Sequence, residues 1–590
     1  MIKVKLINQP DTNKNGLQQV LFNRGITNVK EYLNADISNS LNDFSSFGID
    51  KLREGATALV KHITSPDRIL LIVDSDADGF TSAALLINYL HDLFPSFVEN
   101  YLDWYIHDGK QHGLSDCIEL AKYYKMVICP DSSSNDYEEH RELAMKGIDV
   151  LILDHHEAEK VSTYAIVINN QLSKYPNKFL SGVGVTWQFC RYLDSLNNTS
   201  YANNYLDLVA LGNMGDMMSM KSLETKALIF EGFKDENIKN PYIYAMSKKN
   251  EFALNKTDYK PSEMNGLKIS PMGSAFFITP MINAIVRSGT IEEKELVFKS
   301  MLNYRANELI PSNKRGHKLG EMEKLVDQAI RTSTNVKNRQ TRAEEAGIAL
   351  LEGRIETDNL MEHKVLLFLI KPGEIDRNIA GLVANKFMSK YQRPIGILTK
   401  NEDRYEGSAR GYEGSGITNF KDICAGAGAL YAEGHQGAFG LGIKEEDIDH
   451  FLEYTDEALK DMGSEPIYFV DYIWRYDEID GDKILDIAEM NDYWGKDIDR
   501  SYVYICGIPV NENTLKVMKS NTLKFDIPTA DVIKFGATDN EIEELKAGSR
   551  KINAVCKCAK NEWNGQIDPQ LFIVDYDFVE EKPSIMDWGF

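Results

Sequence analysis

After about residue 56, short apolar runs of three to five residues alternate with longer stretches of helical periodicity. The apolar runs lie at residues 69–73, 102–106, 126–129, 150–153 and 166–168. The helical stretches between them include residues 81–94, 114–124 and 137–146. Because strands that alternate with crossover helices form a parallel sheet with helices on both faces, this pattern predicts a doubly wound α/β domain. A ligand site is then expected at the carboxyl ends of the strands.

The same reading divides the whole chain into five regions. These are an N-terminal extension at 1–55, the predicted sheet at 56–225, a charged helical connector at 226–345, a second, smaller α/β domain at 346–460 and a β-rich region at 465–590. The interior of the connector, residues 292–332, predicts one or two long helices. The second domain shows strands at 365–370 and 395–399 around a helix at 379–390. The spacing of the short β-runs in the last region predicts a small barrel or sandwich.

The composition is that of a folded globular protein, with 43% hydrophobic and 26% charged residues in a chain of 590. No apolar run reaches the roughly 18 residues of a membrane span, and the N-terminus lacks a signal-peptide pattern. None of the seven cysteines forms a CxxC pair, so neither a zinc site nor a redox motif is indicated. A reducing, cytoplasmic location is therefore expected.

The net charge of −23 argues against binding nucleic acid through a generally basic surface. One stretch differs from this average. Residues 313–342 hold eight Lys or Arg against three Asp or Glu. A solvated helix face and a nucleic-acid contact both account for this local excess, and the sequence leaves the two open.

Acidic residues follow several of the predicted strands. The first strand ends in Asp74-Ser75-Asp76-Ala77-Asp78, the third leads to Asp131, and the fourth leads to Asp154-His155-His156, while Asp216 lies further along the chain. Along an extended segment, alternation would point Asp74, Asp76 and Asp78 to the same side. Because strand ends of a parallel sheet share one edge, these carboxylates and imidazoles are expected to meet there. Burying such a cluster without a cation would be costly.

A calcium-binding loop is the main rival interpretation of the first acidic run. Gly79 stands at the sixth position, as that loop requires, but the twelfth position holds Leu85 in place of the required Glu. Mixed carboxylate and imidazole ligands favour manganese, with magnesium as a substitute. The cluster therefore predicts two Mn²⁺ or Mg²⁺ ions that activate water against a phosphodiester.

These motifs resemble those of the DHH phosphoesterases. Asp74 to Gly79 resembles the first motif, Asp154-His155-His156 is the triplet that names the family, and Asp131 and Asp216 lie where its second and fourth motifs fall. Further segments are similar to the RecJ single-strand DNA exonucleases. They are Ser181-Gly182-Val183-Gly184-Val185, Leu208-Val209-Ala210-Leu211-Gly212, and Asn561-Glu562-Trp563 of the oligonucleotide-binding barrel. Two more segments, Gly407-Ser408-Ala409-Arg410 and the run from Gly434-His435 to Gly440, resemble the signatures of the DHH-associated second domain. Pro280-Met281-Ile282-Asn283-Ala284 with Arg287 resembles the segment that leads into the connecting helices.

The resemblance implies a role for each motif residue. The metal ligands would be Asp74, Asp76, Asp78, Asp131, Asp154, His155 and Asp216, with Asp154, His155 and His156 as the catalytic group. The substrate-binding residues would be Ser408, Arg410, Gly434 and His435 of a DHH-associated second domain, together with Arg287, and Trp563 of an oligonucleotide-binding (OB-like) barrel. Trp563 is equally well explained as a barrel-core residue.

The resemblance implies a 5′-to-3′ exonuclease of single-stranded DNA in repair or recombination, with a single-strand-binding protein or a helicase as candidate partners. Two alternatives stay open. One is a phosphodiesterase of short oligonucleotides or cyclic dinucleotides, and the other is a single-strand-binding scaffold without nuclease activity. The sequence departs from the family at Ser132, where Gly is usual, and at Glu433, where a second Gly precedes the His of the second domain.

Overall fold

The computed structural model describes residues 2–109, 111–256, 258–412, 419–461, 467–547, 550–563 and 565–579. The chain forms two compact units. The parallel-sheet unit contains Asn15–Lys337 and Asp486–Arg500, and the second unit contains Met1–Lys14, Asn338–Leu485 and Ser501–Phe590.

The predicted parallel sheet is confirmed. Its strands are β2 (Ile69–Val73), β3 (Leu102–Ile106), β4 (Met126–Pro130), β5 (Asp149–Asp154) and β6 (Ile166–Asn169). They pair in the order β3-β2-β4-β5-β6, and every pair is parallel. The chain moves from β2 outward to β3 and then returns to the other side of β2 at β4. The switch point, where ligands bind in such sheets, therefore lies beyond the ends of β2 and β4.

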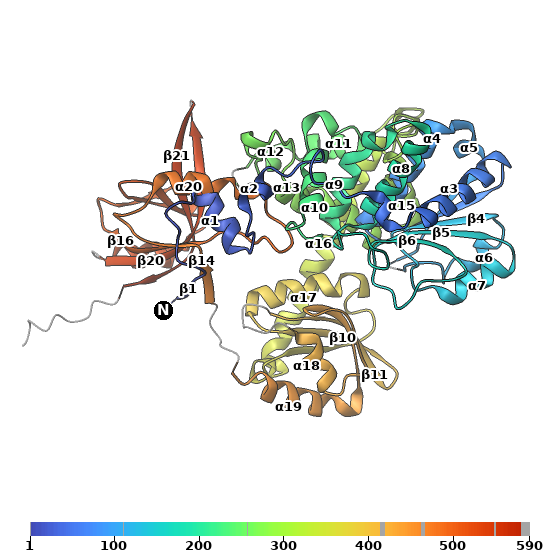
Figure 1. The fold of residues 1–590 in the computed structure, drawn as a ribbon. Coiled ribbons are helices and arrows are strands. Elements are labelled where there is room, and N and C mark those ends of the chain that lie inside the picture. The colour runs from blue at the N-terminus through green and yellow to red at the C-terminus, as the bar shows by residue number, and fades with distance from the viewer. Residues whose placement is uncertain are drawn as a thin grey trace, which may run out of the picture. The chain divides into compact units, whose positions relative to one another are not determined.

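Helices cover both faces of this sheet (Figure 1). Those that contact its strands include α3 (Ile49–Thr64), α4 (Ala77–Leu93), α5 (Pro95–Tyr101), α7 (Tyr137–Met145) and α8 (Gly182–Asn197). The short helix α6 (Ile118–Ala121) lies between β3 and β4 in the sequence. Helix α9 (Leu206–Gly215) packs on α4 and α8, and α10 (Leu223–Gly232) packs on α9. Strands β2 and β4 are buried along their whole length, as expected for a sheet covered on both sides. The predicted helix at 114–124 is wrong in length, because only Ile118–Ala121 is helical and turns precede it.

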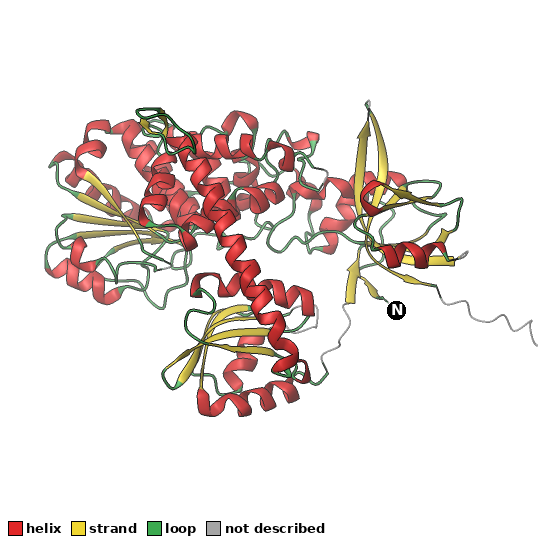
Figure 2. Ribbon diagram, turned by 180° about the vertical axis from the view of Figure 1, so that it is seen from behind, coloured by secondary structure: helices red, strands yellow, loops and turns green. Residues whose placement is uncertain are grey.

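The rest of this unit is mainly helical. It contains α11 (Pro241–Lys249), α12 (Glu251–Leu254), α13 (Pro271–Phe277), α14 (Thr279–Ser288) and α15 (Ile291–Ser300). The prediction of one or two long helices over 292–332 is wrong in the middle of that stretch, where β7 (Leu309–Pro311) and β8 (Met322–Lys324) form a hairpin. Pro311 and two glycines with positive φ, Gly316 and Gly320, account for the break. A long helix, α16 (Leu325–Thr357, 33 residues), follows the hairpin and is the longest helix in Figure 2.

The N-terminal extension is divided between the two units. Strand β1 (Lys3–Leu6) pairs in parallel with β14 (Ile467–Val470) in the second unit. Helices α1 (Gly16–Asn23) and α2 (Val29–Leu33) belong to the parallel-sheet unit. There the buried Lys226 of α10 donates to the carbonyl oxygens of Ala35 (2.8 Å) and Leu33 (3.5 Å). This lysine fixes the segment after α2 to the helical layer.

The second unit contains a mixed five-stranded sheet in the predicted α/β region. Its elements are β9 (Leu366–Ile370), α17 (Arg377–Tyr391), β10 (Ile395–Asn401), β11 (Arg404–Arg410), α18 (Phe420–Gly426), β12 (Tyr431–His435), β13 (Ala438–Lys444) and α19 (Ile448–Ala458). The order is β12-β13-β11-β10-β9, with only β9 and β10 parallel. The two strands and the helix expected here from the sequence are confirmed.

The β-rich nature of the last region is confirmed, but the described strands do not close into a barrel. They form a seven-stranded sheet in the order β15-β16-β20-β21-β19-β18-β17, and its two edge strands, β15 and β17, are not paired with each other. The elements are β15 (Tyr472–Arg475), α20 (Gly481–Ala488), β16 (Val503–Val510), β17 (Leu515–Met518), β18 (Thr522–Asp526), β19 (Asp531–Lys534), α21 (Asp539–Lys546), β20 (Arg550–Trp563) and β21 (Gln566–Phe578). Strand spacing alone does not determine closure, because an open and a closed sheet share the same alternation.

Within the described residues, no helix combines the length and the apolar character that crossing a membrane requires.

Candidate metal centre

The first acidic run spans the junction between β2 and α4. Asp74 directly follows β2, and Asp76 is the N-cap of α4, where its side chain accepts a hydrogen bond from the backbone N–H of Gly79 (2.9 Å). Asp78 lies in the first turn of that helix. The expectation of an extended segment with three side chains on one side is therefore wrong. A helical turn begins at Ala77, and the curvature of that turn brings Asp78 to the site.

The remaining acids come from two more strands and one helix. Asp131 follows β4, and Asp154 is the last residue of β5, with His155 and His156 after it. Asp216 is the C-cap of α9, so it reaches the site from a helix. Asp131 adopts a left-handed backbone conformation, with φ of 67°. That conformation is uncommon outside glycine and is concentrated at functional sites.

His155 lies at the centre of this cluster. Its Nε2 is 3.2 Å from Oδ1 of Asp131, 3.3 Å from Oδ2 of Asp216 and 3.9 Å from Oδ2 of Asp78. Three overlapping groups offer ligand atoms within 4.8 Å of one another: Asp131 with Asp154, His155 and His156; Asp78 with His155 and Asp216; and Asp74 with Asp76 and Asp131. All the predicted metal ligands are thus brought together.

The donors at the centre are incompletely satisfied. Asp131 is 1% exposed, yet neither of its carboxylate oxygens accepts a hydrogen bond from the described residues, and Nε2 of His155 is buried in the same condition. Such groups are costly to bury without a partner. Since carboxylate oxygens and a neutral imidazole are suitable ligands for Mn²⁺ or Mg²⁺, the residues fit divalent cations.

Electrostatics in this cluster agree with that fit. Burial and the neighbouring Asp76 raise the pKa of Asp78 to about 7. Burial and Asp78 raise the pKa values of Asp131 and Asp216 well above their usual range. The carboxyl groups therefore resist ionising together, and a cation would relieve the repulsion.

The two histidines of the triplet differ in protonation. Burial, together with the neighbouring His156, lowers the pKa of His155 to about 4, so at neutral pH its ring is uncharged and able to bind a metal. Partial burial opposes protonation of His156. Its Nδ1 nevertheless lies 2.8 Å from Oδ1 of Asp154, and this hydrogen bond raises the pKa of His156 to about 10. His156 is therefore a cation at neutral pH, with half of its side chain exposed.

Two glycines leave room for the acids. Gly182 at the start of α8 donates its backbone N–H to Oδ2 of Asp78 (2.6 Å), and a Cβ at Gly182 would lie 2.3 Å from Oδ1 of Asp131. A Cβ at Gly212 would lie 2.4 Å from Oδ1 of Asp78. Ser181 and Val183 also donate to Oδ1 of Asp78, at 3.1 Å each. The Ser181 and Gly212 motifs thus form the backbone around the acidic cluster.

Comparison with known proteins shows relatives over the whole chain. The model of the DHH family, N-terminal domain, matches residues 68–213. YorK, a SPbeta prophage-derived protein of Bacillus subtilis strain 168 named as a single-strand DNA-specific exonuclease, is 33% identical over 594 residues, which cover 98% of this chain and 99% of YorK. The single-stranded-DNA-specific exonuclease RecJ of the same organism is 24% identical over 567 residues, covering 90% of this chain and 64% of that relative. The chain is a RecJ-like member of the DHH family.

Solved structures agree with this membership at the level of the fold. A crystal structure of RecJ in complex with Mn²⁺ from Thermus thermophilus matches this RecJ-like protein with a TM-score of 0.70 and 18% identity, covering 96% of this chain and 76% of that one. The structure of RecJ from the same organism in complex with Mg²⁺ matches with a TM-score of 0.64 and 17% identity, covering 96% and 75% of the two chains.

The second-domain residues of this RecJ-like protein gather at one end of the mixed sheet. Arg410 pairs with Ala438, which pairs with His435, and a Cβ at Gly381 of α17 would lie 2.3 Å from Nη2 of Arg410 and 3.5 Å from Oγ of Ser408. Arg410 donates to Oδ1 of Asn385 (2.9 Å) and to the carbonyl oxygen of Ala409 (2.7 Å). Gly434 has a φ of 130°, which favours glycine, and its carbonyl oxygen accepts from Lys421. The side chain of His435 lies outside the described part.

The other predicted substrate residues are placed less fully. Arg287 is a half-buried residue in the last turn of α14, and its charge interacts with that of Asp76, which opposes the lowering of the Arg287 pKa by burial. It therefore belongs to the surroundings of the metal centre. Trp563 ends β20, and its side chain lies outside the described part. In the basic stretch 313–342, Lys314 and Arg331 both pair with Glu323, so part of its charge is neutralised locally.

One residue at the centre was missed from the sequence. Nδ1 of His112 lies 2.6 Å from Oδ2 of Asp74, and this hydrogen bond raises the pKa of His112. His112 belongs to the loop after β3, the neighbour of β2. The position of the loop was the available signal.

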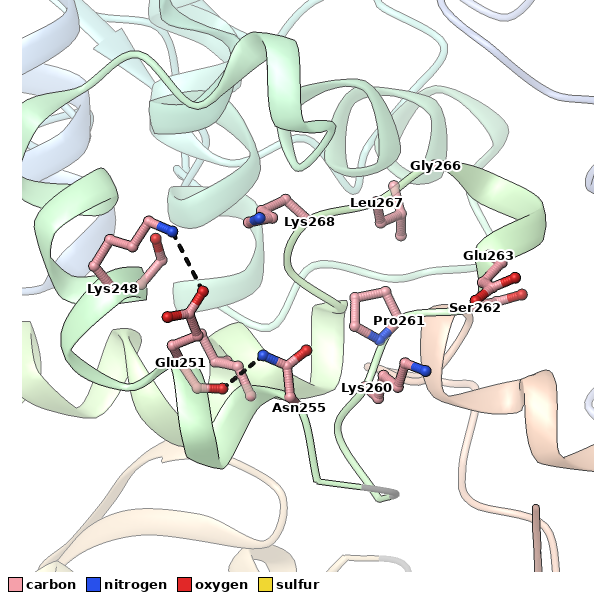
Figure 3. Close-up of a pocket in the computed structure, with 12 residues that line it drawn as sticks. Lys248, Glu251, Asn255, Lys260, Pro261, Ser262, Glu263, Gly266, Leu267 and Lys268 are labelled. Carbon is pink, nitrogen blue, oxygen red and sulfur yellow. Dashed lines mark hydrogen bonds and ion pairs between the residues drawn. The ribbon is translucent and has the colours of Figure 1, made fainter. Parts of the chain in front are cut away.

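A separate pocket of about 200 Å³ lies between α11, α12 and the segment 260–268 (Figure 3). Lys248, Lys260 and Lys268 line it, and Lys248 pairs with Glu251 at 3.3 Å. None of the candidate metal ligands is among its lining residues, so it is distinct from the metal centre.

Proposed function

We propose that this RecJ-like protein is a metal-dependent exonuclease that degrades single-stranded DNA from the 5′ end. The observation that carries the proposal is the meeting of six carboxylates and two imidazoles at one site, where the buried carboxylate oxygens of Asp131 and Nε2 of His155 have no hydrogen-bond partner among the described residues. The names of YorK and of the RecJ relatives, single-strand DNA-specific exonucleases, support the substrate class.

Two Mn²⁺ or Mg²⁺ ions are proposed to bind here. The overlapping ligand groups share Asp131 and His155, as expected where neighbouring ions have bridging or adjacent ligands. One ion would be held chiefly by Asp78, His155 and Asp216, and the other by Asp74, Asp76 and Asp131. Bound ions of this kind supply an activated water and stabilise the leaving oxygen of a phosphodiester.

The protein's own cations would place the substrate. His156, which is protonated and held by Asp154, can donate a hydrogen bond to an oxygen of the scissile phosphate. Arg287 adds positive charge near Asp76. We propose that Ser408, Arg410, Gly434 and His435 bind a terminal phosphate, because a guanidinium grips phosphate in bidentate fashion and glycine lets backbone N–H groups approach closely. The open β-rich sheet, an OB-like region in this proposal, would add contacts along the strand.

The test is digestion of a long single strand bearing either a 5′ phosphate or a 5′ hydroxyl, with Mn²⁺ or with EDTA. We expect Mn²⁺-dependent release of mononucleotides that is faster from the 5′ phosphate. Asp78→Ala and His155→Ala should abolish it. Cleavage confined to dinucleotides would favour a short-oligonucleotide phosphodiesterase. Strand binding without hydrolysis would favour a scaffold.

A further inference from the structure

The loop between β3 and α6 contacts the metal centre through one acid. Besides the contact of His112 with Oδ2 of Asp74, the backbone N–H of Gly113 points to Oδ1 of the same carboxylate at 3.4 Å. Each carboxylate oxygen of Asp74 therefore has a hydrogen-bond partner in this loop. The His112 side chain itself is 58% exposed, so its place depends on the course of the loop more than on packing around the ring.

A buried lysine of α15 fixes the course of this loop. Lys294 of α15 is 1% exposed, and its ammonium donates to the carbonyl oxygens of His107 (2.8 Å) and Gly109 (3.3 Å). Burying an ammonium group is unfavourable unless its hydrogen bonds are made, so the loop backbone and Lys294 depend on each other.

The two ends of the loop have anchors of their own. The ring of His107 contacts Asp116 at 2.9 Å, and the backbone N–H of Leu114 donates to Oδ2 of Asp136 at 2.8 Å. Asp136 lies five residues after Asp131. The loop is thus held at three places: at His107, where it starts, at Gly109 through Lys294, and at Leu114, near its end. His112 lies between the second and the third of these places.

We propose that Lys294 is a positioning residue of the metal centre. It holds the loop so that His112 orients the carboxylate of Asp74 toward a bound cation. This inference rests on the proposed function, since it assumes that Asp74 is a metal ligand. Groups that hydrogen-bond to metal ligands fix the orientation of those ligands, and their loss typically weakens metal binding about 10- to 100-fold.

Lys226 provides a matched control. It is also a buried lysine of the parallel-sheet unit, 2% exposed, and it also donates to two backbone carbonyl oxygens, those of Ala35 and Leu33. Its loop carries no candidate metal ligand. Lys226→Met should therefore lower the melting temperature as Lys294→Met does, while leaving metal binding unchanged.

The experiment measures the Mn²⁺ affinity of the full chain by electron paramagnetic resonance, for the wild type, His112→Phe, Lys294→Met, the double variant and Lys226→Met. We expect each of the first two variants to bind Mn²⁺ about 10- to 100-fold more weakly. The double variant should bind Mn²⁺ no more weakly than the more strongly affected single variant, because both substitutions act through the same contact. His112→Gln, which keeps a donor for Asp74, should retain most of the affinity.

Three results overturn the inference alone: wild-type affinity in Lys294→Met, losses that add in the double variant, or an equal loss in Lys226→Met. If Lys294→Met does not fold, Lys294→Gln, which keeps a donor, takes its place with the same non-additivity expected. A wild-type chain that binds no Mn²⁺ overturns the proposed function, and this inference with it.

Discussion

The metal centre and the Arg410 cluster of the mixed sheet are both proposed to act on one phosphodiester substrate, yet they are built differently. At the metal centre Asp78, Asp131, Asp154 and His155 are buried, and within the described residues the carboxylate oxygens of Asp131 and Nε2 of His155 have no hydrogen-bond partner. Ser408 and Arg410 are half-buried, and Arg410 already donates to Asn385 and Ala409. The first site needs cations to satisfy its groups, whereas the second is stable as it stands and can exchange its contacts for phosphate. Substitutions should therefore affect metal binding at one site and substrate binding at the other.

The largest effect is expected for Asp131→Asn. Removing this shared ligand should lower the Mn²⁺-dependent rate by more than about 100-fold, beyond the loss typical of groups that only support a ligand. In EDTA the same variant should melt at a higher temperature, because one buried carboxyl among like charges is gone. Rate and melting temperature are the two measurements. The control is Asp103→Asn. Asp103 lies on β3 and forms an ion pair with Arg68. If Asp131→Asn is less active and also melts at a lower temperature in EDTA than the wild type, this contrast between the two sites is contradicted.

Gly182→Ala should come next. Its Cβ would lie 2.3 Å from Oδ1 of Asp131, so that carboxylate has to move. We expect Mn²⁺ affinity to fall about 10- to 100-fold, as for other groups that set the orientation of a ligand. Isothermal titration with Mn²⁺ measures this. Gly353→Ala in α16, where nothing lies within 4 Å of the added Cβ, should leave the affinity unchanged. Equal Mn²⁺ affinity in Gly182→Ala and Gly353→Ala would show that the carboxylates do not need the close approach of the Gly182 backbone.

Arg410→Lys tests the other side of the comparison. Lysine keeps the charge but loses the planar, bidentate grip, so KM for a 5′-phosphorylated strand should rise about 10-fold. Mn²⁺ affinity should stay at the wild-type value. Arg404→Lys, at the opposite end of β11, controls for a general loss of charge on that strand. A fall in Mn²⁺ affinity with unchanged KM would reverse the assignment of the two sites.

The smallest effect is expected from pH. Asp78 has a pKa raised to about 7, so below pH 7 a cation must displace its proton. Mn²⁺ affinity should therefore decrease as the pH falls from 8 to 6, by at most about tenfold per unit for each proton that the cation displaces. His155, with its pKa lowered to about 4, adds no dependence in this range. Titrations at three pH values with the same affinity would exclude a protonated Asp78.

Much of the parallel sheet could be predicted from the sequence, because its strands are short apolar runs with acids at their ends. Residues 69–73 and 102–106 are strands with those same bounds. The acids meet because strand order and chirality leave one edge for them, although Asp78 arrives through a helical turn and Asp216 through the end of α9.

The misses have a common physical cause. His112 is an exposed residue in a loop, and what brings it to Asp74 is a contact from Lys294, 182 positions later in the chain. The hairpin of β7 and β8 and the open edges of the seven-stranded sheet likewise depend on pairings between segments. Local periodicity reports which face of an element is apolar, and it does not report such long-range partners.

The left-handed backbone at Asp131 links ion supply to the stability of the protein. Asp131 and Ser133 both have positive φ, and such conformations cost about 1–3 kcal/mol each. A cation at 100 times its Kd stabilises the folded state by about 2.7 kcal/mol, which is of the same size. The free energy that a bound cation supplies is therefore large enough to offset the strain of this turn, and the folded chain should be more stable with its ions than without them.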